Sequence, residues 1–163
     1  MMKRLYFVSM ALLAALVLPV AASAAASMGK PAPNFTAPLA SGGKFTLSSL
    51  HGKPVYLNFF ATWCAPCNAE APDINALQKQ YQRRGFVTIG VDEREDADKA
   101  KSFVHKFNLI YKAIVDENGD VLSPYGAIGL PVHVFIDRRG NVKLIRNGEM
   151  SKSEIEAAIK SIL

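Results

Sequence analysis

The chain has 163 residues, which is enough for one domain with a substantial hydrophobic core. Lys and Arg exceed Asp and Glu by 19 to 14, and this net charge of +5 is dispersed in single residues and short pairs. The balance argues against a nucleic-acid-binding protein, and the sequence contains neither an internal repeat nor a low-complexity domain.

The N-terminus has the pattern of a secretory signal. Met1–Arg4 carries two positive charges, Leu5–Val20 is almost wholly apolar, and small residues follow. The apolar run of 16 residues is short for a membrane span, which needs about 20. Ala22-Ser23-Ala24 fits an A-x-A cleavage site. We therefore expect a signal peptide at residues 1–24 and export from the cytoplasm, with an uncleaved membrane anchor as the alternative.

The first part of the exported chain predicts an extended segment followed by a hairpin and a strand. Residues 25–33 contain two prolines and are expected to run extended into a domain of residues 34–163. Phe35–Leu39 and Lys44–Leu47 flank Ser41-Gly42-Gly43, which is typical of a β-hairpin. Val55–Phe60 is a nearly continuous apolar run, as expected of a central strand that is covered on both faces.

Both cysteines of the chain follow that strand, in Trp63-Cys64-Ala65-Pro66-Cys67, where a helix is expected to begin near Pro66 and to end near Arg83. Because a helix repeats every 3.6 residues, the two cysteines lie on one side of it, within disulfide reach. A bridge that encloses two residues adds little stability. The residue after Cys67 is Asn68 and not the His of a c-type haem site. The spacing therefore favours a redox dithiol over a structural disulfide or a metal site, and no cofactor is expected.

The position of the pair at a helix N-terminus predicts different roles for the two cysteines. The unpaired amide groups and the dipole of the helix favour an anion there, which stabilises a Cys64 thiolate. We expect Cys64 to attack a substrate disulfide, and Cys67 to resolve the mixed disulfide that results.

The rest of the chain alternates predicted strands and helices. Phe86–Val91 is a predicted strand, and the charged residues 92–98 lead into a helix whose apolar positions face the core. Tyr111–Val115 is another strand, Val132–Ile136 and Val142–Arg146 form a hairpin, and a capping box at Ser151 opens a last helix. This order predicts an α/β fold with a mixed sheet and helices on both faces.

With these elements in place, the residues resemble the thioredoxin superfamily over Lys30–Leu163. The specific marks are the segment from Val55 to Cys67, Pro72 in the helix, and Gly129-Leu130-Pro131 before a strand. The signal segment, the hairpin and the extra helix and strand after Asp92 resemble the extracytoplasmic TlpA- and ResA-like branch. The resemblance implies a thioredoxin fold: a central mixed β-sheet flanked by helices, with an N-terminal β-hairpin and an extra helix-strand insertion.

The resemblance also implies the composition of the site. Leu130–Pro131 would be a cis peptide packed against the disulfide, so that Pro131 joins the cysteines in the catalytic site. Trp63, Ala65, Pro66 and Leu130 would contact the substrate. His133, two residues after Pro131, is interpreted as a buried strand histidine without a catalytic role.

One position departs from the superfamily pattern. Thioredoxins have a buried Asp six residues before the first cysteine, and here that residue is Asn58, which cannot accept a proton. Glu70, one helical turn after Cys67, resembles the acidic residue that the TlpA- and ResA-like branch has beside its active site. We hypothesise that Glu70 assists deprotonation of Cys67. The alternative is a solvated glutamate on the helix surface.

The function implied by the resemblance is a monomeric, extracytoplasmic thiol-disulfide oxidoreductase. Ala65-Pro66 is similar to the reducing members, some of which keep the haem-site thiols of apocytochrome c reduced with electrons from a membrane thiol donor. An oxidase or isomerase with the same site, or a non-catalytic binding module on this fold, remains an alternative. A peroxiredoxin-type peroxidase is excluded because neither cysteine has the required Pro and Thr before it.

Overall fold

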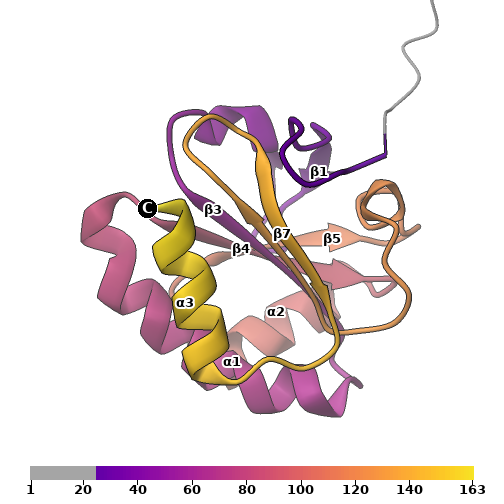
Figure 1. Cartoon of the computed structure of the whole chain (residues 1–163). Helices are drawn as coiled ribbons and strands as arrows, with labels where there is room; N and C mark the ends of the chain where they lie inside the picture. The colour runs from indigo at the N-terminus through magenta and orange to yellow at the C-terminus, as the bar shows by residue number, and fades with distance from the viewer. Residues whose placement is uncertain (1–24) are drawn as a thin grey trace, which may run out of the picture.

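The computed structural model describes residues 25–163, so the predicted signal at residues 1–24 lies outside the described residues. Its centre is a five-stranded mixed sheet with the order β5-β4-β3-β6-β7 (Figure 1). Three strands are parallel: β3 (Val55–Phe60), β4 (Val87–Glu93) and β5 (Lys112–Asp116). The antiparallel strands β6 (Val132–Ile136) and β7 (Val142–Asn147) complete the sheet beside β3.

All three α-helices pack on one face of this sheet (Figure 1). They are α1 (Ala65–Tyr81), α2 (Ala97–Lys106) and α3 (Lys152–Ile162). Their apolar residues join Tyr56 and Phe60 of β3 in one core cluster. The expectation of helices on both faces is met on the opposite face only by short 3-10 helices, and no α-helix of residues 25–163 lies there. The connections β3–α1–β4 and β4–α2–β5 step in the same direction along the sheet, and right-handed crossovers that do so put their helices on the same side.

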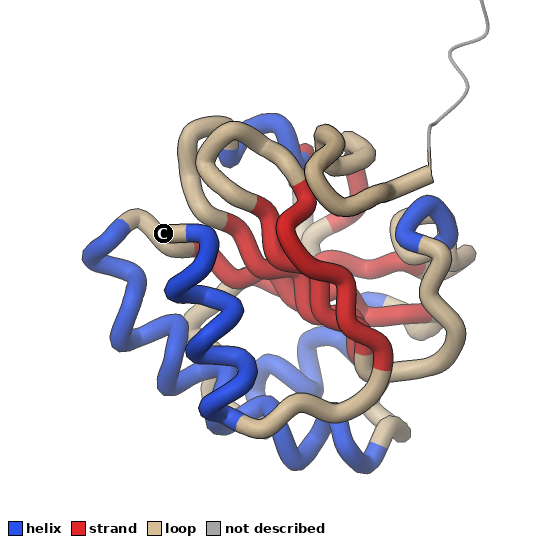
Figure 2. Tube along the Cα trace, viewed as in Figure 1, coloured by secondary structure: helices blue, strands red, loops and turns tan. Residues whose placement is uncertain are grey.

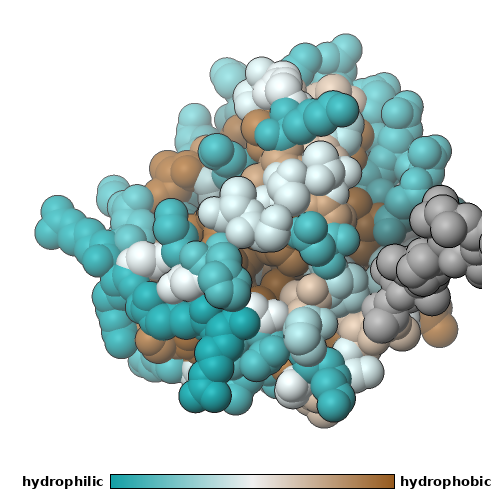
Figure 3. Space-filling model, turned by 90° about the horizontal axis from the view of Figure 1, so that it is seen from above, coloured by the Kyte–Doolittle hydropathy of each residue, from teal (hydrophilic) through white to brown (hydrophobic). Residues whose placement is uncertain are grey.

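Short elements cover the opposite face, where Val55, Leu57 and Phe59 of β3 form a second core cluster. These elements are the hairpin β1 (Thr36–Pro38) and β2 (Lys44–Thr46) and the 3-10 helices η1 (Leu47–Leu50) and η3 (Ser123–Tyr125). A further 3-10 turn, η2 (Gln82–Arg84), ends α1. Figure 2 shows loops joining the strands and helices at both ends of the sheet. Seen from above, hydrophilic residues cover most of the surface, and apolar residues show between them in several places (Figure 3). Burial on both faces explains the continuous apolar sequence of β3.

The segment of residues 25–33 is tied to the hairpin between β6 and β7. The amide of Gly29 donates to the carbonyl of Val142 at 2.7 Å, and that of Ala32 donates to Gly140 at 2.9 Å. The segment contains a turn at residues 28–30 and a bridge from Pro31 to Asn141. Within residues 25–163, no helix has the length and apolar character needed to cross a membrane.

The predicted strands, helices and hairpins are all present, and the capping box at Ser151 and Glu154 is confirmed. β4 extends two residues beyond the predicted end. Asp92 and Glu93 are buried strand residues and not part of a charged loop, because parallel pairing with β5 continues opposite Val115 and Asp116.

Candidate active site

Cys64 and Cys67 lie at the start of α1, just beyond the carboxyl end of β3, and are joined by a disulfide with a Cα–Cα distance of 5.3 Å. Pro66 is in the first turn of the helix, where the missing amide hydrogen costs no intrahelical bond. Both cysteines are nearly buried. The sequence therefore produces a rigid strand-to-helix junction that presents two sulfur atoms one helical turn apart.

The two sulfur atoms have different environments at the start of α1. Cys64 is the N-cap residue, and its Sγ accepts a hydrogen bond from the amide of Cys67 at 3.3 Å. The first turn of α1 contains no acidic residue that would oppose a negative charge. An anion on the Cys64 sulfur would thus be stabilised by an amide and by the helix dipole, whereas Cys67 lies inside the helix.

Pro131 reaches the same edge of the sheet from β6. The Leu130–Pro131 peptide bond is cis. Because Val132 pairs with Phe59 in the antiparallel register, Pro131 comes next to the end of β3, where the cysteine loop begins. Leu130 is partly buried against the core cluster that contains both cysteines. The two segments that carry the predicted site are therefore neighbours.

The predicted substrate-contacting residues differ in exposure. Trp63 is 71% exposed, which is unusual for so large an apolar side chain. Ala65 is also exposed, and Pro66 is half-buried. These residues flank the disulfide and form a partly apolar rim beside two nearly buried sulfur atoms.

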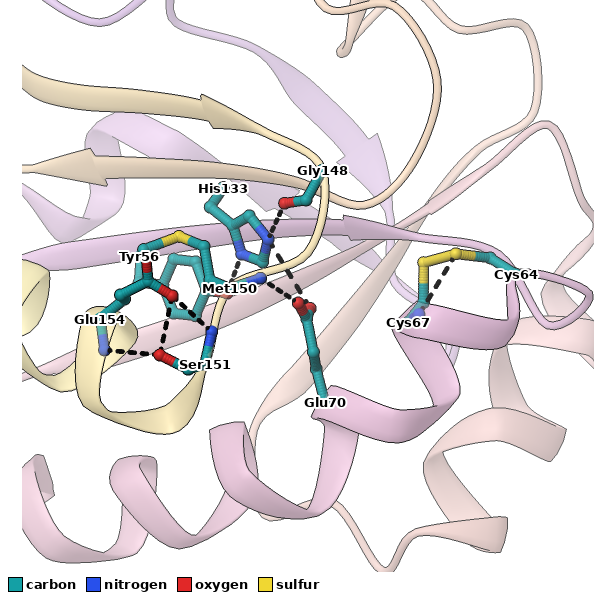
Figure 4. A network of polar contacts seen from close by, with 9 residues as sticks. All are labelled: Tyr56, Cys64, Cys67, Glu70, His133, Gly148, Met150, Ser151 and Glu154. Carbon is teal, nitrogen blue, oxygen red and sulfur yellow. Dashed lines mark hydrogen bonds and ion pairs between the residues drawn. A yellow bond between two sulfur atoms is a disulfide. The ribbon is translucent and has the colours of Figure 1, made fainter.

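Glu70 is 4% exposed and so is not a solvated surface residue. Its Oε1 accepts a hydrogen bond from the amide of Met150 at 2.6 Å, while its Oε2 has no hydrogen-bond partner (Figure 4). Burial, together with the nearby Glu149, raises the pKa of Glu70 to about 7 despite the hydrogen bond from the Met150 amide. A carboxyl group that titrates near neutral pH thus lies one helical turn after Cys67.

His133 is fully buried and forms the far side of the same network (Figure 4). Its Nδ1 is 2.6 Å from the hydroxyl of Tyr56, and its Nε2 is 3.1 Å from the carbonyl oxygen of Gly148 and 3.6 Å from Oε2 of Glu70. Burial lowers the pKa of His133 to about 4, so the imidazole is neutral at pH 7 and the contact with Glu70 is not an ion pair. The position of His133 predicted its burial, but not its contacts.

Asn58 occupies the position where thioredoxins have an Asp. It is 3% exposed and pairs with His133 across β3 and β6, and its Nδ2 has no hydrogen-bond partner. The ionisable carboxyl group near the cysteines is therefore supplied by α1, through Glu70, and not by β3.

Comparisons with known proteins agree with this geometry. The model of the AhpC/TSA family matches residues 28–145. The chain is 37% identical over 135 residues to the thiol-disulfide oxidoreductase ResA of Bacillus thuringiensis subsp. konkukian, covering 83% of this chain and 78% of that protein. A putative thiol:disulfide interchange protein DsbE from Chlorobium tepidum is 31% identical, with a TM-score of 0.78 over 84% of this chain and 98% of its own. The chain belongs to the ResA-like thiol-disulfide oxidoreductases of the thioredoxin superfamily.

A disulfide oxidoreductase from Mycobacterium tuberculosis, described as secreted and as homologous to Escherichia coli DsbE, is 32% identical to this oxidoreductase. The match has a TM-score of 0.71 and covers 78% of this chain and 95% of the mycobacterial one.

The cysteine loop of the oxidoreductase is held by residues that the sequence analysis missed. The amide and the hydroxyl of Thr62 both donate to the carboxylate of Glu95, at 2.5 and 2.6 Å. On the other side, Nδ2 of Asn68 donates to the carbonyl groups of Thr62 and Cys64, at 3.0 and 2.7 Å. The loop is thus fixed between α1 and the segment before α2. No local pattern identifies such a contact, because Thr62 and Glu95 are 33 residues apart.

Asp92, three residues before Glu95, is fully buried, and neither of its carboxyl oxygens has a hydrogen-bond partner. Burial, with Glu95 as the next cause, raises the pKa of Asp92 to about 8, so Asp92 is protonated at neutral pH. Within residues 25–163, no three His, Cys, Asp or Glu side chains form a cluster that could hold a metal ion.

Proposed function

We propose that this oxidoreductase works outside the cytoplasm as a dithiol reductant of disulfides in protein substrates. The observation that carries the proposal is the Cys64 sulfur at the N-cap of α1, one turn before Cys67 and beside the edge of the sheet where β6 begins. The pair Ala65-Pro66, which is similar to that of reducing members, supports the direction of electron transfer.

The extracytoplasmic location rests on the signal pattern of residues 1–24, cleaved after Ala24 or retained as an anchor. The secreted mycobacterial relative supports it. We further propose a monomer that receives electrons from a membrane thiol donor. A role in keeping apocytochrome c thiols reduced is the most specific form of the proposal, and it rests on the resemblance to the TlpA- and ResA-like branch.

In the first step, the thiolate of Cys64 attacks one sulfur of the substrate disulfide. The substrate S–S bond breaks, a substrate thiolate leaves and takes a proton from water, and Cys64 is held in a mixed disulfide. Trp63, Ala65, Pro66 and Leu130 would contact the substrate around this bond. Pro131, which has no amide hydrogen, would lie against the substrate chain.

In the second step, Cys67 loses its proton to Glu70 and attacks the Sγ of Cys64. The mixed disulfide breaks, the second substrate sulfur leaves as a thiolate and takes a proton from water, and the Cys64–Cys67 disulfide forms. Two electrons have then passed from the dithiol to the substrate. Burial of Glu70 suits it to this exchange, because a carboxyl group with a pKa of about 7 can both accept and release a proton at neutral pH.

Trapping the mixed disulfide tests the assignment of the two cysteines. With Cys67→Ser, reduced protein should accumulate as a covalent adduct with insulin, because nothing resolves the bond at Cys64. With Cys64→Ser, no adduct should form at the same pH and time. The adducts are counted by non-reducing electrophoresis and located by mass spectrometry.

Adducts of equal yield in the two variants would contradict the proposed order of attack. A protein that lacks both cysteines and still accelerates insulin reduction would contradict the dithiol mechanism itself. For location, the mass of the protein recovered from an exported fraction should correspond to a start at Ala25 if the signal is cleaved after Ala24.

A further inference from the structure

The protonation of His133 is determined by its two fixed neighbours. The carbonyl oxygen of Gly148, at 3.1 Å from Nε2, can only accept a hydrogen bond, so Nε2 carries a hydrogen. Since the buried imidazole is neutral, Nδ1 carries none and accepts from the hydroxyl of Tyr56 at 2.6 Å. Tyr56 and Gly148 thus select the same tautomer from opposite sides of the ring.

This tautomer places the Nε2–H group, which donates to Gly148, close to Oε2 of Glu70. Oε1 of Glu70 is occupied by the amide of Met150, which precedes the capping box of α3. Oε2 has no hydrogen-bond partner, and Nε2 of His133 lies 3.6 Å from it (Figure 4). That distance is too long for a hydrogen bond, but short enough for the N–H dipole to stabilise a negative charge in a buried site.

We propose that His133, oriented by Tyr56, is a positioning residue that stabilises the carboxylate form of Glu70 and so prepares it to accept the Cys67 proton. The inference rests on the proposed function for its last step only, since the coupling of His133 to Glu70 is a property of the resting protein. It changes the interpretation of His133 from a residue of the buried core to a part of the active site.

The surrounding charges set the direction of the effect. Three groups surround Glu70: His133 of β6, Tyr56 of β3 and Glu149 of the turn before α3. Arg146 of β7 lowers the pKa of His133. Burial and Glu149 both favour the protonated form of Glu70. The Met150 amide and the Nε2–H group of His133 are the two donors that oppose them. Without His133, Glu70 would hold its proton to higher pH and would be a poorer acceptor at neutral pH.

The test is a pH titration of the Glu70 carboxyl carbon by NMR in the oxidised protein, in which neither cysteine titrates. His133→Phe removes the N–H group but keeps an aromatic ring, whereas His133→Gln retains an N–H donor. We expect His133→Phe to raise the midpoint by about one pH unit, a tenfold change in the ionisation constant. His133→Gln should restore most of the shift, and His105→Gln, at an exposed site on α2, should leave the midpoint unchanged.

Two measurements cover the case in which His133→Phe does not fold. In the unaltered protein, the ring nitrogens of His133 should show the neutral Nε2–H tautomer from pH 5 to 8, with a chemical-shift inflection at the midpoint of Glu70. Tyr56→Phe keeps the ring stacked on Phe135 at 4.5 Å and removes only the hydroxyl. It should raise the Glu70 midpoint by less than His133→Phe does.

An unchanged or lowered Glu70 midpoint in His133→Phe would overturn the inference, as would an Nδ1–H tautomer in the unaltered protein. The rate at which Cys67 resolves a mixed disulfide, followed against pH, should shift upward together with the midpoint. If the midpoint moves and the rate profile does not, the coupling of His133 to Glu70 stands, and the proton-accepting role of Glu70 under the proposed function is contradicted.

Discussion

At the scale of residues, the amide of Cys67 and the N-terminus of α1 stabilise a negative charge on the Cys64 sulfur. Because its sulfur is the N-cap acceptor of α1, the thiol of Cys64 in the reduced protein should have a pKa below the usual value of about 8.5. Cys67, inside the helix, should ionise at higher pH. The absorbance of the thiolate near 240 nm and the rate of alkylation by iodoacetamide measure both. Ionisation of Cys67 before Cys64 would contradict the assigned roles.

Glu70 accounts for the second half of the reaction. Glu70→Gln preserves the shape of the side chain and its contact with the Met150 amide region, but cannot accept a proton. If proton transfer from Cys67 is needed, resolution of a mixed disulfide at pH 7 should slow by about 100-fold. Rapid mixing of preformed adduct measures this rate.

The matched control for this prediction is Glu117→Gln, which removes an exposed carboxylate in the turn after β5. Its resolution rate should stay close to that of the unaltered protein. Equal rates and equal pH profiles for Glu70→Gln and the unaltered protein would mean that Glu70 is not the proton acceptor.

At the scale of elements, the end of β4 places two buried acids on opposite faces of the sheet. Asp92 lies on the helix side of the sheet, opposite Phe60 of β3, and neither of its oxygens has a hydrogen-bond partner. Glu93 lies on the other side, where it accepts a hydrogen bond from Arg94, and burial followed by Asp116 raises its pKa to about 7. A buried carboxyl group without a hydrogen-bond donor costs stability once it ionises. Ionisation of these acids therefore destabilises the end of β4, the strand that leads into Glu95 and its hydrogen bonds to the cysteine loop.

Asp92→Asn tests this interpretation. The folded pKa of Asp92 is about 8 and its reference value is 3.8, so its unfavourable contribution is absent below about pH 4 and complete above about pH 8. The amide cannot ionise and can donate to Glu95. Urea unfolding should show a gain of about 1–3 kcal/mol at pH 8 and a smaller gain at pH 5. An equal effect at both pH values, or one shared by the exposed variant Asp120→Asn, would contradict it.

The elements themselves could be predicted because their signals are local. The apolar run of β3, the glycines between β1 and β2 and the Ser151–Glu154 capping box each specify a structure within a few residues. The cysteine pair lies between an apolar run and Pro66, and this order predicted its position at the start of a helix. The placement of all three α-helices on one face required the strand order, which no local pattern contains.

The site was predictable only where it followed chain periodicity. Glu70 lies beside the apolar stripe of α1, and this spacing put it near Cys67 but did not establish its burial. The contact of His133 with Tyr56 and Glu70 joins residues from three elements, and the Thr62–Glu95 hydrogen bonds join two distant loops. Such contacts depend on strand register and helix docking.

At the scale of the whole molecule, the buried ionisable groups predict a stability that falls as pH rises. Glu70, Asp92 and Glu93 have folded pKa values above their reference values, so their unfavourable contribution to stability grows between about pH 4 and pH 8. His133, whose folded pKa is lowered, acts in the opposite direction below pH 6.5 but is a single group.

The melting temperature of the oxidised protein should therefore be several degrees lower at pH 8.0 than at pH 5.5. For a domain of this size, about 1 kcal/mol corresponds to 2–4 °C. Calorimetry at constant ionic strength measures the difference, and Asp92→Asn should reduce it. An equal or higher melting temperature at pH 8.0 would show that these groups do not govern the pH dependence.

The reduction potential of the Cys64/Cys67 pair tests the proposed direction of electron transfer most directly. It is obtained by equilibrating residues 25–163 with dithiothreitol or glutathione buffers and counting free thiols. A reductant of protein disulfides should have a potential near or below about −250 mV, close to that of thioredoxin. A value above about −150 mV would contradict the account, because electrons would then flow from substrate thiols to the protein and the same site would serve an oxidase or isomerase.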